Sequence, residues 1–151
     1  MRWTNADASR PAFFLLSTNW AKTGNCPPLV SELDIFERLD STSTRGHNGA
    51  LHRNTTGPCR TPDEFNDNHW TDDAGVDLSA GFHTYSALWT TEEVIWYLDG
   101  RELKRWPVYD STDQRMFLII SSGAGGRTWD RDAAIPVELR TEVDWVRVWQ
   151  R

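Results

Sequence analysis

The spacing of apolar residues constrains the fold of this chain more than any other feature of its sequence. They occur in short runs of roughly four to eight residues, separated by turn-forming residues. No segment keeps the 3.6-residue period of an amphipathic helix. Short apolar runs bounded by Gly, Pro, Asn and Asp are typical of β-strands. We therefore expect an all-β protein.

The expected strands and loops follow from these runs. The strands are Ala12–Ser17, Ser31–Arg38, Gly49–Arg53, His83–Thr90, Val94–Leu98, Glu102–Trp106, Met116–Ser121 and Glu142–Trp149, the last closing a sheet edge. Long polar loops are expected at Asn19–Val30, Ser41–Asn48 and Asn54–Asp77. The dipeptide Asp99-Gly100 predicts a tight hairpin turn. This pattern predicts one domain over residues 1–151, a two-sheet antiparallel β-sandwich of the jelly-roll kind.

Charge and composition narrow the classes of partner. The formal net charge is -6 and the basic residues are scattered, which disfavours nucleic acid. No run of 18 apolar residues exists that would span a membrane. The chain has nine tryptophans, whose flat faces can fill a core or stack on sugar rings. An acidic surface does not disfavour a neutral polysaccharide, and stacking of some of these tryptophans on sugar rings is compatible with such a partner. The sequence does not indicate an oligomeric state.

The two cysteines leave two alternatives open. Cys26 and Cys59 lie in polar stretches that contain proline, and no CxxC or Cys/His metal pattern exists. They either form one disulfide that ties two loops together or remain unpaired thiols.

The segment Glu32-Leu33-Asp34-Ile35-Phe36-Glu37 places three carboxylates in an otherwise apolar strand. Crowded or buried carboxylates resist ionisation, so such a group is costly unless it is exposed or functional. A solvent-facing charged strand is the ordinary alternative. Side chains alternate along a strand, so Glu32 and Asp34 share a face and Glu37 points away. A single β-bulge at Ile35-Phe36 would return Glu37 to the face of Glu32.

The chain from Pro11 to Arg151 resembles glycoside hydrolase family 16, the group of laminarinases, lichenases and agarases. Glu32 to Glu37 matches the family signature E-x-D-x-x-E in its bulged form. Similar blocks, in the same order as in the family, are Pro11–Leu16, His83–Tyr85, Trp89-Thr90, Ile95–Gly100 and Val143–Val148. The resemblance implies a concanavalin-like jelly roll.

The resemblance also implies the roles of the three carboxylates. Glu32 would be the nucleophile and Glu37 the general acid/base of a retaining mechanism. Asp34 would assist both through hydrogen bonds and by separating their pKa values.

Other residues match family positions that line the substrate cleft. Phe14 stands where the family often has a stacking tryptophan, and Trp129 resembles a loop tryptophan near the cleft. His52 matches a cleft position or is a structural histidine. No cofactor is expected. Members of the family often carry a structural calcium, and Asp144 matches one contributing position.

The resemblance begins near the middle of the family's domain. We therefore expect an incomplete sandwich, with the N-terminal strands and any export signal outside this chain. The predicted function is extracellular or periplasmic endo-hydrolysis of a β-linked polysaccharide, either a laminarin-type β-1,3-glucan or a bacterial exopolysaccharide. Transglycosylation is a variant of that reaction. The alternatives are a non-catalytic glycan-binding β-sandwich and an inactive fragment.

Overall fold

The computed structural model describes residues 1–6, 8–18, 31–39, 43–53, 66–108, 115–124 and 138–150. These ranges contain strands and no helix, which confirms the all-β prediction. The strands are β1 Arg2–Trp3, β2 Ser9–Ser17, β3 Ser31–Glu37, β4 Gly46–Arg53, β5 Asn66–Asp73, β6 Tyr85–Trp89, β7 Glu93–Leu98, β8 Arg101–Pro107, β9 Met116–Ala124 and β10 Thr141–Glu142.

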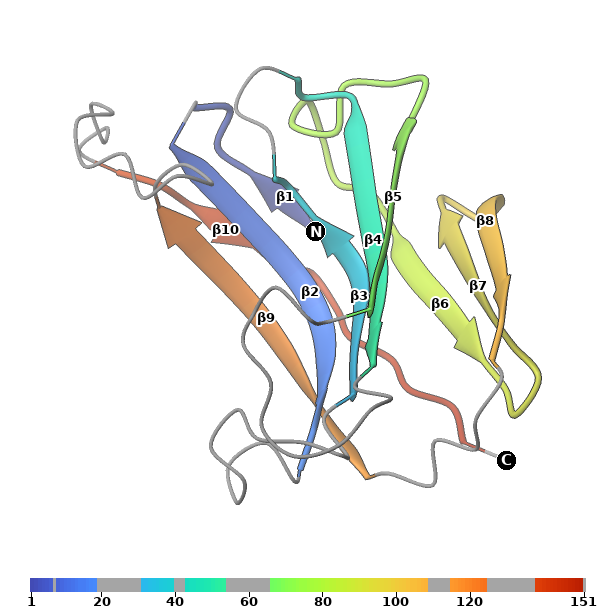
Figure 1. Ribbon diagram of the computed structural model, residues 1–151. Coiled ribbons are helices and arrows are strands. Elements are labelled where there is room, and N and C mark those ends of the chain that lie inside the picture. The colour runs from blue at the N-terminus through green and yellow to red at the C-terminus, as the bar shows by residue number, and fades with distance from the viewer. Residues whose placement is uncertain are drawn as a thin grey trace.

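The strands form three antiparallel sheets. The largest has the order β5-β4-β3-β2-β9, and the second has the order β6-β7-β8. The short strands β1 and β10 pair with each other. Figure 1 shows the larger sheet as a row of five strands, with β6, β7 and β8 grouped beyond β4 and β5.

The turn between β7 and β8 confirms the predicted hairpin. Asp99 has a φ of 50° and Gly100 a φ of 80°. Positive φ at both central residues is the geometry of a type I′ turn, whose twist matches that of the strands it joins. The Asp-Gly pair is therefore the local reason that Ile95–Leu98 and Arg101–Arg105 lie side by side.

The hydrophobic core lies between the two larger sheets. The five-stranded sheet contributes Leu33, Ile35 and Phe36, and the three-stranded sheet contributes Val94 and Trp96. Leu33, Phe36, Val94 and Trp96 are at most 1% exposed. Because β3 supplies core residues with one face, its other face is left for the carboxylates.

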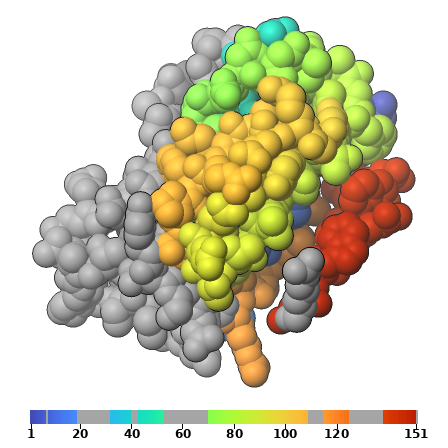
Figure 2. Space-filling model, turned by 90° about the vertical axis from the view of Figure 1, so that its right-hand side faces the viewer, coloured from blue at the N-terminus to red at the C-terminus, as the bar shows by residue number. Residues whose placement is uncertain are grey.

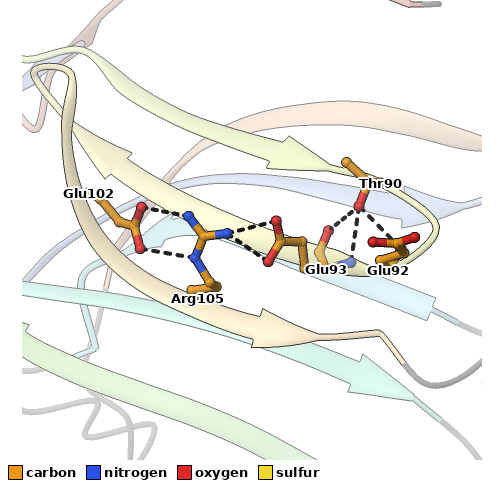
Figure 3. Close-up of polar contacts among 5 residues, drawn as sticks. All are labelled: Thr90, Glu92, Glu93, Glu102 and Arg105. Atoms are coloured by element: carbon orange, nitrogen blue, oxygen red, sulfur yellow. Dashed lines mark hydrogen bonds and ion pairs between the residues drawn. The ribbon is translucent and has the colours of Figure 1, made fainter.

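The exposed side of β7 and β8 carries an ion-pair network. Arg105 donates two 2.7 Å hydrogen bonds to the carboxylate of Glu93 and a 2.9 Å bond to Glu102 (Figure 3). At the start of β7, Thr90 Oγ1 accepts from the main-chain N–H groups of Glu92 and Glu93. Exposed ion pairs of this kind contribute little to stability, roughly 0–1 kcal/mol.

Two of the expected loops are partly wrong. Strand β5 lies within the segment Asn54–Asp77, and β4 begins at Gly46, within Ser41–Asn48. Among the residues of β5 whose side chains the structure describes, 70–73, Trp70 belongs to the buried core cluster. With a single apolar residue among polar ones, β5 has no alternation that identifies a strand.

The expected final strand, Glu142–Trp149, is also wrong. Only Thr141 and Glu142 form a strand, and they pair with β1. Val143, Val148 and Trp149 are exposed and lie in no strand. Their alternation suits a strand, but no described strand lies beside them to complete the ladder. In Figure 2 this C-terminal segment, in red, lies at the margin of the molecule.

Some predictions fall outside the described residues. They are the loop Asn19–Val30, residues 41–42 and 54–65 of the other two loops, and both cysteines. Within the described ranges there is no helix of the length and apolarity needed to cross a bilayer.

Candidate active site

A β-bulge interrupts β3 at the position that the sequence predicts. Against β2, Phe36 pairs with Phe13 and Asp34 pairs with Phe14. Ile35 is therefore the extra residue, opposite no residue of β2. A second register shift between Asp34 and Glu37 appears against β4. The bulge changes which side chains of β3 share a face.

The bulge brings Glu37 to the same face as Glu32. On β4, Glu32 lies opposite His52 and Glu37 opposite Asn48. Strand β4 pairs regularly with β5 from Gly46 to Arg53, so His52 and Asn48, four positions apart, share a face. Directly opposed residues of an antiparallel pair also share a face. The two glutamates therefore lie on one face, about 13 Å apart along the strand.

Asp34 lies between the two glutamates on that face. It is 1% exposed, and its Oδ2 lies 2.8 Å from Nε2 of His52. Its Oδ1 is buried with no hydrogen-bond partner in the described structure. A buried carboxylate oxygen without a partner is costly in a resting protein and marks a place where a ligand or a protonated neighbour can donate.

This environment changes the pKa of the Glu37 carboxyl group. Burial raises its pKa to about 7, and the negative charges of Asp34 and Glu32 act in the same direction. His52 opposes them. Glu37 therefore carries a proton in much of its population at neutral pH, whereas an ordinary glutamate is ionised. A general acid needs this property.

Side chains from other strands bind the main chain of the bulge. Trp96 Nε1 donates to the carbonyl of Asp34 at 2.7 Å, and Asn48 Nδ2 donates to the carbonyl of Glu37 at 2.8 Å. His47 Nε2 lies 2.9 Å from the carbonyl of Ile35. None of these three residues was predicted as a site residue from the sequence. A contact with a distant main-chain carbonyl leaves no pattern in the sequence.

Two of the three substrate-binding residues expected from the sequence can be placed. Phe14 is half-buried and pairs with Asp34, so it shares the face of the carboxylates. His52 lies on the same face and contacts Asp34 directly. Trp129 lies outside the described residues. The structure thus brings Phe14 and His52 together with all three carboxylates.

A polar pocket of about 320 Å³ adjoins the Glu37 end of this face. Its wall includes Asn48, which opposes Glu37, and Thr71, which opposes Asn48 on β5. The remaining lining residues are Arg38, Ser43, Arg45, Gly46, Asp72 and Asp73. Two arginines and two aspartates leave this wall without net charge.

The position expected to contribute to a calcium site can be placed, but the described residues show no carboxylate cluster around it. Among them, no three His, Cys, Asp or Glu side chains gather around a common point. Asp144, the position that resembles a calcium ligand, is exposed.

Fold and site together define an antiparallel β-sandwich that carries a bulged carboxylate motif on one sheet face. The family model for glycosyl hydrolases family 16 matches residues 3–147, and the chain belongs to this family.

Individual relatives agree with the family assignment. The chain is 33% identical to endo-1,3-1,4-beta-glycanase ExsH of Rhizobium meliloti (strain 1021) over 139 residues, which cover 92% of this chain and 26% of that protein. The laminarinase catalytic domain from Thermotoga maritima MSB8 superposes with a TM-score of 0.63 at 28% identity, covering 83% of this chain and 51% of that one. The endo-beta-1,3-glucanase from Pyrococcus furiosus superposes with a TM-score of 0.64 at 25% identity. That superposition covers 91% of this chain and 54% of the glucanase chain.

These superpositions confirm the expected jelly-roll sandwich. They also show that the chain spans about half the length of the solved relatives and about a quarter of the length of the Rhizobium relative.

Proposed function

We propose that this chain carries the catalytic pair of a retaining endo-hydrolase of β-linked polysaccharide. Glu32 is the nucleophile and Glu37 is the general acid/base. The observation that supports this most is the bulge, which puts Glu37 on the face of Glu32 while its surroundings keep it protonated near neutral pH. Double displacement needs one carboxylate and one carboxylic acid with their carboxyl groups roughly 5–5.5 Å apart. Two glutamate side chains on a common face, leaning toward each other from backbone positions about 13 Å apart, can approach that separation.

The reaction proceeds in two displacements at the anomeric carbon. In the first, the Glu32 carboxylate attacks that carbon while the bond to the leaving oxygen breaks, and Glu37 gives its proton to that oxygen. In the second, water attacks the glycosyl-enzyme, Glu37 takes the proton of the water, and the Glu32 carboxylate is released. Two inversions give net retention. Neither displacement requires a cofactor.

Asp34 supports both steps through charge and hydrogen bonding. Its negative charge raises the pKa of Glu37, so the acid form is available for the first displacement. Its Oδ1 is free to accept a hydrogen bond from a protonated carboxyl or a sugar hydroxyl. His52 holds the other oxygen, Oδ2, and so fixes the orientation of Asp34.

The substrate we propose is a polymer that contains β-1,3-linked glucose or a bacterial exopolysaccharide. The relatives named above as glycanase, laminarinase and glucanase support this class. Phe14 offers a half-buried aromatic ring for a sugar face, and the neutral polar pocket beside Asn48 suits hydroxyl groups. Because intact polysaccharide does not enter the cytoplasm, the reaction takes place outside the cell or in the periplasm.

The test is release of reducing ends from laminarin and from mixed-linkage β-glucan by the 151-residue chain. Glu32→Gln and Glu37→Gln should each lower the rate by at least about a thousandfold, because each removes one partner of the displacement. Glu93→Gln, on the exposed side of β7, is the matched control and should retain the wild-type rate (Figure 3). Binding of glycan without cleavage by the wild type would replace the hydrolase with the glycan-binding function.

A further inference from the structure

The bulge that sets the carboxylate geometry has a structural cost. The register shifts place Ile35 as an extra residue in β3. A bulge leaves its extra residue unpaired and disrupts the hydrogen-bonded ladder locally. A buried carbonyl without a donor costs roughly 1–3 kcal/mol, and a regular strand would avoid that cost. The bulge persists only if other groups satisfy such carbonyls.

Two buried side chains contact the main-chain carbonyls of two consecutive residues of the bulge, Asp34 and Ile35. The indole of Trp96 donates to the carbonyl of Asp34 at 2.7 Å. The imidazole of His47 contacts the carbonyl of Ile35 at 2.9 Å. Both side chains are 0% exposed, so water does not compete for these carbonyls. The two contacts fall on the residues that form and flank the bulge.

His47 is a donor at every pH at which the site can act. Burial lowers its pKa to about 4, so the ring is neutral and carries one N–H. A carbonyl can only accept, and therefore that hydrogen lies on Nε2, facing Ile35. Nδ1 is buried and has no partner in the described structure, as expected for the nitrogen without hydrogen.

Aromatic packing fixes the orientation of both donors. Trp96 meets Trp106 edge to face, with centroids 5.7 Å apart and an interplanar angle of 85°. His47 meets Phe36 in the same manner, at 5.2 Å and 78°. Trp96 comes from β7 and His47 from β4, so the bulge is held both across the core and from the neighbouring strand.

We propose that Trp96 and His47 are positioning residues of the active site. Their N–H groups hold the carbonyls of Asp34 and Ile35, which locks the bulge and keeps Glu37 on the face of Glu32. A strand whose register slips by one residue turns its side chains to the opposite face. Without the two donors, β3 is more stable as a regular strand, because the carbonyls of Asp34 and Ile35 would otherwise lack hydrogen bonds. Loss of the bulge then turns Glu37 away from the carboxylate cluster. The catalytic meaning of this geometry rests on the proposed function.

The test compares two tryptophan-to-phenylalanine variants in one core. Trp96→Phe removes the N–H that binds Asp34. Trp70→Phe removes the same atoms from a neighbouring buried tryptophan whose Nε1 has no hydrogen-bond partner in the described structure. The readouts are kcat and KM on laminarin and the pKa of Glu37, followed by ¹³C NMR of the carboxyl group.

Trp96→Phe should lower kcat by about tenfold to a hundredfold with KM changed by less than about twofold, because it misplaces the acid rather than the substrate. The pKa of Glu37 should fall from about 7 toward its ordinary value as the cluster separates. Trp70 also stacks on His47, with ring centroids 5.2 Å apart. Phenylalanine keeps a ring at that place and removes no hydrogen bond to the bulge, so Trp70→Phe should leave both readouts near those of the wild type.

Equal effects of the two variants, or an unchanged pKa of Glu37 in Trp96→Phe, would overturn the proposal. The pKa comparison needs no turnover, so it decides the positioning role even if the wild type fails to hydrolyse glycan and the proposed function falls. If Trp96→Phe does not fold, β-(3-benzothienyl)alanine in place of Trp96 keeps the ring shape and replaces N–H by sulfur. It should show the same loss of kcat and the same fall in pKa, and wild-type values would overturn the proposal.

Discussion

The chemistry of Glu37 depends on its neighbours. In water a glutamate is ionised at neutral pH, but burial and the charges of Asp34 and Glu32 bring the pKa of Glu37 to about 7. This shift has a consequence for stability that is independent of catalysis. The folded chain holds a proton that the unfolded chain releases between about pH 4.5 and pH 7.

The free energy of unfolding should therefore fall as pH rises through that window. Below pH 4.5 Glu37 is protonated in both states, and above pH 7 the folded chain contains a buried, crowded carboxylate. Glu37→Gln removes the charge and should be more stable than the wild type at pH 8, by on the order of 2 kcal/mol. Near pH 4.5 the two should be nearly equal. Urea denaturation of both proteins at pH 8 and pH 4.5 measures the free energy of unfolding. The same difference between variant and wild type at both pH values would contradict the prediction.

The sequence predicted the carboxylates of the site but not the groups that hold them. The three carboxylates lie within one six-residue segment, Glu32 to Glu37. Their crowding in an apolar strand is visible without a structure. Trp96 and His47 reach the same site through the fold. His47 was expected in a loop, and nothing local distinguishes a tryptophan that binds a distant carbonyl from one that fills a core.

At the scale of the strands, close packing of β4 and β5 depends on a glycine. Gly49 lies opposite Trp70, and a Cβ built at Gly49 would stand 2.8 Å from Cε2 of the indole. Real Cβ contacts are longer, so the indole or the strand must move to admit an alanine. The strand carries a second glycine, Gly46, around which no atom lies within 4 Å of an added Cβ.

Gly49→Ala should therefore destabilise the chain by about 1–3 kcal/mol through overpacking. Gly46→Ala, its control on the same strand, should change stability by less than about 0.5 kcal/mol. Urea midpoints at fixed pH compare the two. A Gly49→Ala variant as stable as Gly46→Ala would show that the indole moves aside without cost.

The strands that the sequence predicted share clear local signals, and the strands that it missed lack them. The Asp99-Gly100 turn identifies the β7–β8 hairpin because both residues tolerate positive φ. The bulge in β3 is predictable because the carboxylate spacing requires it. Strand β5 was not predicted because its sequence has a single large apolar residue, Trp70, and so shows no alternation. The segment from Val143 to Trp149 alternates like a strand, yet it has no described partner strand.

At the scale of the molecule, the two larger sheets are joined at the site itself. The indole of Trp96 crosses from β7 to the main chain of β3, so packing of the three-stranded sheet is coupled to the carboxylate geometry. The family match over residues 3–147 and the superposed relatives show that the sandwich has the fold of glycosyl hydrolases family 16. The remaining question for the whole chain is whether the two glutamates perform the two roles proposed for them.

Azide rescue of Glu32→Ala separates these roles in a single measurement. Removing the nucleophile leaves space beside the anomeric carbon in which azide can attack, while Glu37 still protonates the leaving oxygen. With an activated β-glucoside of laminari-oligosaccharide and added azide, ¹H NMR of the anomeric signal gives the configuration of the product. The account predicts an α-glycosyl azide, formed by one inversion. A β-glycosyl azide, or hydrolysis at the wild-type rate without azide, would contradict the assignment of Glu32 as the nucleophile.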